Sequence, residues 1–194
     1  RLLKNTALSY LGAIDDAEAH QLCMKQFNLG HNMTDVISAL GSLSHTNSDE
    51  RVKAFDAFYT KWKNDALVLD KWLALQAISS RESTLDDVKA LTKHEAFTIK
   101  NPNRVRALLG AFTQENPTGF HEKTGAGYAF IDDKILELNG LNPQVAARLL
   151  RTAFTQWRRY DVSRQGLMKA QLERIVASEG LSPDVYEIAS KSLK

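Results

Sequence analysis

The sequence predicts an all-α protein, an irregular α-solenoid of about eleven helices that pair antiparallel with their neighbours. The first observation is apolar spacing: Val52, Phe55, Tyr59 and Trp62 follow one another at steps of three and four, which places them on one helix face. The second is that similar spacing recurs along most of the chain, whereas no alternating run of β-branched residues is bounded by turn signals. The third is that the predicted helices follow one another with short connections.

The starts of several helices are marked by a capping residue followed by proline. Asn or Ser accepts a hydrogen bond from an unpaired amide of the first turn, and proline at the first helical position loses no needed donor. These dipeptides are Asn101-Pro102, Asn142-Pro143 and Ser182-Pro183. With the apolar spacing they predict helices over residues 1–13, 15–27, 32–45, 49–63, 66–79, 84–94, 102–114, 127–139, 143–159, 163–178 and 183–193.

Other local signals predict how individual helices begin and end. Gly140 and Gly180 are expected where helices end, and glycine there can take the left-handed cap conformation. Thr84 and Asp87 resemble a capping box. The stretch around Pro117 is the longest one predicted to be irregular, and Gly125 is expected to lead into the next helix.

Composition limits the classes of function. The chain has 194 residues, a length that suits one large domain or two small ones, and we expect a single domain over residues 1–194. Its net charge of +2 does not favour nucleic-acid binding. A single cysteine excludes an internal disulfide, and we expect a cytoplasmic protein. No apolar run is long enough to span a membrane. Because the sequence begins without Met, we interpret it as a piece of a longer protein.

The histidines do not form a recognisable metal site. His94 and His121 are each followed by Glu, but neither has the second His four residues later that a zinc-protease helix requires. His20 and Cys23 lie one turn apart, and two ligands do not complete a zinc site. We therefore predict no metal site and no catalytic residue in this chain, and we interpret the three Trp residues as core anchors.

Arginines on two polar helix faces are the candidate binding residues. Gln144, Arg148, Arg151 and Thr155 follow at steps of four, three and four, opposite the apolar stripe of their helix, and Arg106 lies off the stripe of its own helix. One interpretation is a solvated surface. The other is a cavity lining, in which guanidinium groups bind carboxylates or peptide carbonyls. The spacing alone leaves both open.

Five segments together resemble a known family. They are NMTDVISAL at 32–40, DKWLALQA at 70–77, NPNRVRALLGAF at 101–112, GYAFIDDKILELNGLNPQVAARLL at 127–150 and RRYDVSRQ at 158–165. In these segments the chain resembles the C-terminal helical domain of bacterial aminopeptidase N, a gluzincin zinc metalloaminopeptidase, and the resemblance extends over nearly all of its length.

The resemblance implies an enzyme that removes N-terminal residues from peptides. Its zinc-binding His-Glu-x-x-His helix, downstream Glu and Gly-x-Met-Glu-Asn segment belong to an earlier domain, and this chain contains none of them. The resemblance also implies a solenoid that covers the catalytic domain of the same polypeptide and encloses a substrate cavity. The zinc would therefore lie outside this chain, which we expect to be inactive alone.

Three residues match positions that line the cavity in the family. Arg106 comes from NPNRVR, and Gln144 and Arg148 come from NPQVAAR. For these residues the resemblance favours cavity lining over a solvated face. The arginines of the 102–114 helix, Arg104 included, are accordingly interpreted as polar lining of an enclosed peptide path.

Two other functions are weighed against this one. A stand-alone helical-repeat module would bind a partner peptide on its concave face, and its gene would begin close to Arg1. Nucleic-acid binding would require steep salt dependence, and the small net charge argues against it. Upstream coding sequence that contains the zinc motif would favour the enzyme.

Overall fold

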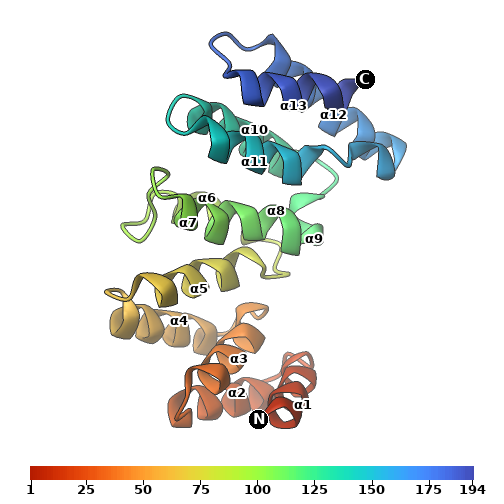
Figure 1. The fold of residues 1–194 in the computed structure, drawn as a ribbon. Helices are drawn as coiled ribbons and strands as arrows, with labels where there is room; N and C mark the ends of the chain where they lie inside the picture. The colour runs from red at the N-terminus through yellow and green to blue at the C-terminus, as the bar shows by residue number, and fades with distance from the viewer.

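The computed structural model describes all 194 residues, and every regular element in it is a helix. The helices stack in chain order, so the two termini lie at opposite ends of the stack (Figure 1). Most consecutive helices contact each other, most extensively α2 with α3, α10 with α11 and α12 with α13. The predicted all-α solenoid is confirmed, and most helices bury their apolar side against their neighbours.

The bounds of most helices agree with the prediction to within a few residues. The α-helices are α1 Leu2–Gly12, α2 Ala17–Leu29, α3 Met33–Ser44, α4 Asp49–Trp62, α5 Ala66–Ala77, α6 Thr84–Leu91, α7 Pro102–Val105, α8 Ala111–Glu115, α9 Pro117–Phe120, α10 Ala126–Asn139, α11 Pro143–Phe154, α12 Val162–Ala177 and α13 Pro183–Leu193. A π-helical turn, η1 Arg106–Gly110, joins α7 to α8, and a 3₁₀ turn, η2 Trp157–Arg159, follows α11.

Two regions differ from the prediction in their helix content. The predicted helix 102–114 is continuous but contains the π turn η1. The stretch around Pro117, predicted to be irregular, contains the short helix α9. Asn116 caps α9 by accepting a hydrogen bond from the Gly119 amide at 2.9 Å, so the Asn-Pro signal operates here too.

The capping box predicted at Thr84 is not formed. Thr84 does not cap a helix: its hydroxyl donates to the Ser79 carbonyl at 3.0 Å, and α6 has no side-chain cap. Gly140 follows the last residue of α10, as predicted, but its φ of −76° lies in the right-handed region. Gly180, with a φ of +71°, adopts the predicted left-handed conformation. Gly125, at φ +75°, directly precedes α10 as expected.

The aromatic anchors hold neighbouring helices together. Trp72 is buried, and its indole donates to the Phe55 carbonyl of α4 at 3.0 Å. Trp157 is also buried and donates to the Ser192 carbonyl of α13 at 2.9 Å. Val52, predicted on the buried face of α4, is 52% exposed, because the buried side of α4 is centred on Phe55 and Phe58.

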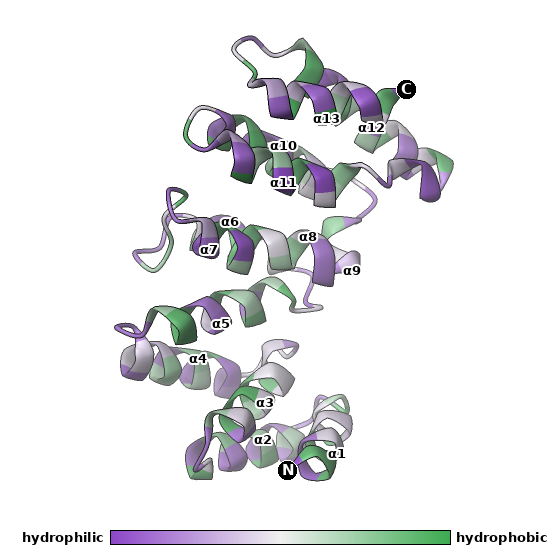
Figure 2. Ribbon diagram, viewed as in Figure 1, coloured by the Kyte–Doolittle hydropathy of each residue, from purple (hydrophilic) through white to green (hydrophobic).

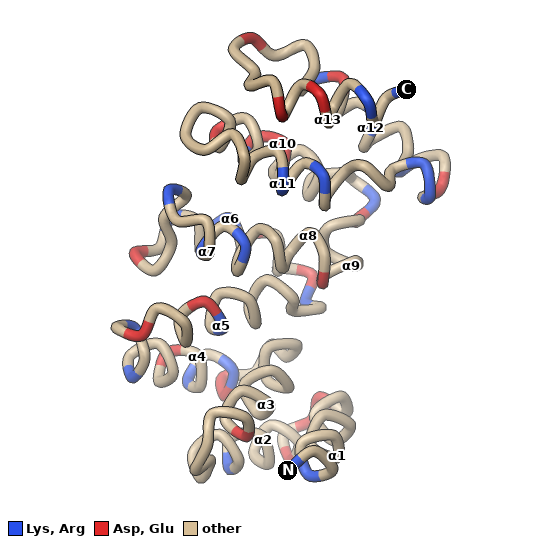
Figure 3. Tube along the Cα trace, viewed as in Figure 1, with Lys and Arg blue, Asp and Glu red and all other residues tan.

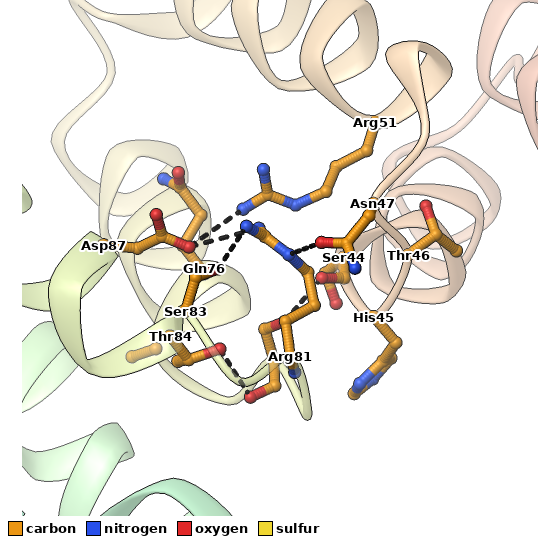
Figure 4. Close-up of polar contacts among 12 residues, drawn as sticks. Ser44, His45, Thr46, Asn47, Arg51, Gln76, Arg81, Ser83, Thr84 and Asp87 are labelled. Carbon is orange, nitrogen blue, oxygen red and sulfur yellow. Dashed lines mark hydrogen bonds and ion pairs between the residues drawn. The ribbon is translucent and has the colours of Figure 1, made fainter.

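A polar cluster links the α3–α4 connection to the α5–α6 connection (Figure 4). The Arg81 guanidinium donates to Asn47 at 2.7 Å and to Ser83 at 2.6 Å, and it lies 3.1 Å from the Asp87 carboxylate. Arg51 of α4 approaches the same carboxylate at 3.8 Å. Asp87, predicted to take part in a capping box, is therefore a shared ion-pair partner that joins successive helix pairs.

Arg104 is a structural residue rather than part of a polar lining. Its side chain is buried in the contact between α7 and α5. The guanidinium donates to the Ala66 carbonyl at 2.9 Å and forms an ion pair with Asp70. Both partners belong to the start of α5, so Arg104 holds the first turn of α7 against α5, and its interpretation as cavity lining is wrong.

We expect Arg104→Ala to lower the free energy of unfolding by about 3 kcal/mol, because it leaves the half-buried Asp70 carboxylate without its cation. Arg106→Ala is the matched control two residues later. It removes an exposed side chain, and its effect should stay within about 0.5 kcal/mol. Urea unfolding of both variants measures the difference, and equal losses would contradict this structural role of Arg104.

Asp132 is a buried carboxylate between α10 and α12. Its side chain is fully buried, one oxygen accepts from Arg174 at 2.8 Å, and the other has no hydrogen-bond partner. Burial raises the pKa of Asp132 to about 6, although the neighbouring Arg174 opposes that rise. Asp133, on the exposed side, pairs with the same Arg174 at 2.6 Å.

This raised pKa predicts a specific pH dependence of stability. The folded state holds the Asp132 proton more tightly than the unfolded state, so the contribution of Asp132 to stability is largest below about pH 4 and falls by about 3 kcal/mol as the pH rises through 6. Asp132→Asn should remove that dependence, and the wild type should gain stability relative to the variant on going from pH 7 to pH 4.

Asp133→Asn is the matched control, since it alters the exposed carboxylate paired with the same arginine. Chemical denaturation at several pH values measures the stability of each protein. A difference between wild type and Asp132→Asn that stays constant from pH 4 to pH 7 would contradict the prediction.

Candidate functional site

A groove of about 440 Å³ lies between the α7–η1–α8 segment and α11, two segments that contact each other in the stack. All three predicted site residues, Arg106, Gln144 and Arg148, line this groove. Arg106 comes from the start of η1, and the other two come from the first half of α11. The structure thus brings together residues that lie about forty positions apart in the sequence.

The lining of the groove is rich in hydrogen-bond donors and contains no acidic residue. The polar lining residues are Asn103, Arg106, Gln114, Asn142, Gln144, Arg148 and Thr152. Neither Arg106 nor Arg148 forms an ion pair within the chain. Figure 3 shows basic residues on both segments. Guanidinium and amide groups in this arrangement can donate hydrogen bonds to carboxylates and peptide carbonyls.

Asn-Pro caps place the first turns of both helices at the groove. The Asn101 side chain accepts from the Asn103 amide at 2.9 Å, and Asn142 accepts from the Val145 amide at 3.3 Å. Pro102 takes the first helical position of α7, and α11 begins in the same way. The first turn of a helix carries partial positive charge. The start of α11 therefore adds to the positive electrostatic potential that Arg106 and Arg148 create in the groove.

The π turn shapes the wall that carries Arg106. It runs from Arg106 to Gly110, and both of these residues line the groove. Gly110 is buried and has no side chain to fill the space between Arg106 and Gln114, its nearest neighbours on the groove side. π turns occur often at functional sites. The segment RALLG carries no sequence signal that distinguishes it from an ordinary α-helical turn.

The helix spacing grouped some residues that the structure separates and missed one that lines the groove. Arg151 and Thr155, grouped with Gln144 and Arg148 by spacing, do not line the groove, and the Thr155 hydroxyl bonds to the Arg151 carbonyl at 2.8 Å. Thr152 does line it. The relevant spacing is therefore a strict step of four from Gln144 through Arg148 to Thr152, which a closer reading of the helix face would have found.

The other candidate metal ligands are paired with neighbouring side chains or buried. His20 lies 2.8 Å from Asp15, and Cys23 is buried. His121 lies between two hydroxyl groups, at 2.8 Å from that of Tyr128 and 2.9 Å from that of Tyr160. No group of three or more His, Cys, Asp or Glu side chains is placed to hold a metal ion, and none of the helices combines the length and hydropathy that crossing a membrane requires.

Relatives of known name cover the whole chain. It is 43% identical over 193 residues to aminopeptidase N of Caulobacter vibrioides and 40% identical over 193 residues to aminopeptidase N of Escherichia coli, covering all of this chain and 22% of each relative. The solved structure of Legionella pneumophila aminopeptidase A in complex with aspartic acid is 39% identical, with a TM-score of 0.91 over 98% of this chain and 22% of that one.

The family model that matches residues 1–194 is described as a domain of unknown function (DUF3458_C) with ARM repeats. ARM repeats are stacked helices, in agreement with the solenoid seen here. The chain spans about a fifth of the length of the relatives that it matches. The chain therefore belongs to the DUF3458_C family of ARM-repeat domains and corresponds to the C-terminal domain of aminopeptidase N.

Proposed function

We propose that this chain is the C-terminal domain of a cytoplasmic zinc aminopeptidase that removes N-terminal amino acids from peptides. In this proposal the solenoid packs over the catalytic domain of the same polypeptide, caps its active site and encloses the path that peptides follow to it. The names of the relatives support the reaction class, and the groove supports the role of this domain within the enzyme.

The groove between η1 and α11 is the observation that carries this role. A peptide that extends beyond its first residues presents backbone carbonyls and ends in a carboxylate, all of them acceptors. Arg106 and Arg148 supply planar, permanently charged donors, and Gln144 supplies a neutral one. The lining contains no acidic residue, so no carboxylate within the groove competes for these donors.

The zinc ion of the proposed enzyme would be held by residues outside this chain. The His, Cys, Asp and Glu side chains here form no group that fits a metal ion, since a zinc site needs at least three protein ligands. What this chain would contribute is exclusion of water, exclusion of folded proteins and electrostatic positioning of the peptide.

In the complete enzyme, we expect Arg148→Ala to raise KM for peptides of several residues about tenfold. A hydrogen bond to a charged group contributes about 1.5 kcal/mol, which corresponds to that factor. Single-residue anilide substrates do not reach the groove, so their KM should change much less. Steady-state kinetics on both substrate classes measures the effect.

Arg151→Ala is the matched control, because it removes an exposed arginine of the same helix outside the groove. It should leave both KM values near those of the wild type. If Arg148→Ala changed peptides and anilides equally, the groove would not bind the substrate.

Residues 1–194 alone should show no aminopeptidase activity and no stoichiometric zinc, because both require ligands that this chain does not contain. Hydrolysis of aminoacyl anilides and elemental analysis of the purified chain measure these two properties. EDTA-sensitive hydrolysis by the chain alone would overturn the assignment of the catalytic centre to another domain.

A further inference from the structure

Trp62 differs from the other two tryptophans of the chain. The indole N–H groups of Trp72 and Trp157 donate to backbone carbonyls, whereas the indole of Trp62 has no acceptor within the chain. Trp62 is the last residue of α4 and is only partly buried. A packed indole usually finds a hydrogen-bond partner, so Trp62 packs against the core with an unused donor.

Trp62 lines a pocket of about 360 Å³ between the second half of α4 and the connection from α2 to α3. Figure 2 shows hydrophobic and hydrophilic residues interspersed along α4, and the pocket includes residues of both kinds. The volume is at the small end of the range for small-molecule sites, so the pocket fits one ring or one branched chain. Its apolar lining consists of Phe27, Met33, Val36, Ala57, Phe58 and Trp62.

The α2–α3 connection forms one wall of this pocket by close packing. A Cβ added at Gly30 would lie 2.6 Å from a methyl group of Val36, which is shorter than any ordinary carbon–carbon contact. Both residues line the pocket. Glycine at position 30 therefore allows the chain to pass directly over Val36, and the wall does not depend on a loosely packed loop.

The polar lining residues supply hydrogen-bond donors and no negative charge. They are Asn28, His31, Asn32 and Lys61. The side chain of Asn32 is engaged in capping α3. The Lys61 ammonium has no ion-pair partner within the chain and lies 5.4 Å from the centre of the Trp62 ring. A positive charge thus stands beside the unused indole donor at an apolar surface.

This combination selects the charge of a ligand as well as its shape. A carboxylate is attracted by Lys61 and can accept a hydrogen bond from Trp62. An ammonium group would be repelled by Lys61 and would find no carboxylate in the lining. The pocket therefore favours an apolar carboxylate over a free amino acid, which carries both charges.

We propose that this pocket binds a small apolar carboxylate that has no cationic group. The ring or branched chain of the ligand lies against Phe27 and Phe58. Its carboxylate accepts from the indole of Trp62 and faces Lys61. The pocket shares no lining residue with the groove between η1 and α11, so the ligand binds separately from the peptide path of the proposed function, and the inference does not depend on peptidase activity.

Three probes of similar size test the charge preference on the full-length polypeptide: 3-phenylpropionate, 3-phenylpropionamide and phenylalanine. At the efficiency usual for ligands, about eleven non-hydrogen atoms give a Kd of about 4 mM, which titration by ligand-observed NMR can measure. The acid should bind about tenfold more tightly than the amide, because hydrogen bonds between charged groups are stronger. It should bind more tightly than phenylalanine by at least about the same factor.

Lys61→Met keeps an aliphatic side chain and removes the charge, so it should abolish the preference for the acid over the amide. Lys63→Met is the matched control, since it alters an exposed lysine outside the pocket, and it should preserve the preference. Trp62→Phe keeps an aromatic wall without the indole donor, and it should weaken the binding of acid and amide by about fivefold each.

Equal affinities of the wild type for acid and amide would overturn the proposal. An acid affinity that is unchanged in Lys61→Met overturns it as well, because the acid then binds elsewhere in the polypeptide. Tighter binding of phenylalanine than of the acid contradicts the exclusion of ammonium groups. Lys61 is exposed, so its replacement leaves the fold intact, and a loss of preference in that variant reports on the pocket rather than on unfolding.

Discussion

Burial of one apolar side of each helix against its neighbours is the constraint on which the rest of the structure depends. Isolated helices of eleven to sixteen residues, the range of the main helices here, are marginal in water. Each one is stable because its apolar side is covered, as Leu149 and Leu150 of α11 are. In a stack built this way, the polar sides remain available for function and an uncovered apolar side requires a partner.

The groove follows directly from this constraint. Helix α11 turns its apolar side to α10 and α13, which leaves Gln144, Arg148 and Thr152 on the side that faces η1. Across the groove, the apolar residues of the neighbouring segment are likewise turned inward, with Leu108 and Leu109 fully buried. The two polar surfaces therefore meet because their apolar counterparts are directed elsewhere. The donor-rich lining is a product of helix packing, because buried apolar residues on both elements hold them in place.

The sequence predicted the fold well because helical periodicity and caps are local signals, read from a few neighbouring residues. Prediction from the sequence failed where the role of a residue depends on a contact partner that is distant in the chain. Arg104 and Arg106 look alike in the sequence, yet Arg104 lies within reach of Asp70, a partner that only the packing of α7 on α5 provides. Gly140 and Gly180 look alike as well, and only Gly180 takes the left-handed conformation. The grouping of Arg106 with Gln144 and Arg148 came from the family resemblance, since no spacing rule links positions on separate helices.

Enclosure of the groove would change the binding free energy that its two arginines, Arg106 and Arg148, can contribute. In this chain both guanidinium groups are exposed to water, where a hydrogen bond or ion pair contributes little because solvent competes for it. A covering catalytic domain would remove that water and lower the local dielectric, so that the same donors would bind an acceptor more strongly. Two uncompensated positive charges would then also repel each other more strongly unless a carboxylate or carbonyl lay between them. Under the proposed enclosure, Arg106 and Arg148 would bind an acceptor strongly only when the catalytic domain covers the groove, and the isolated chain would bind peptides weakly.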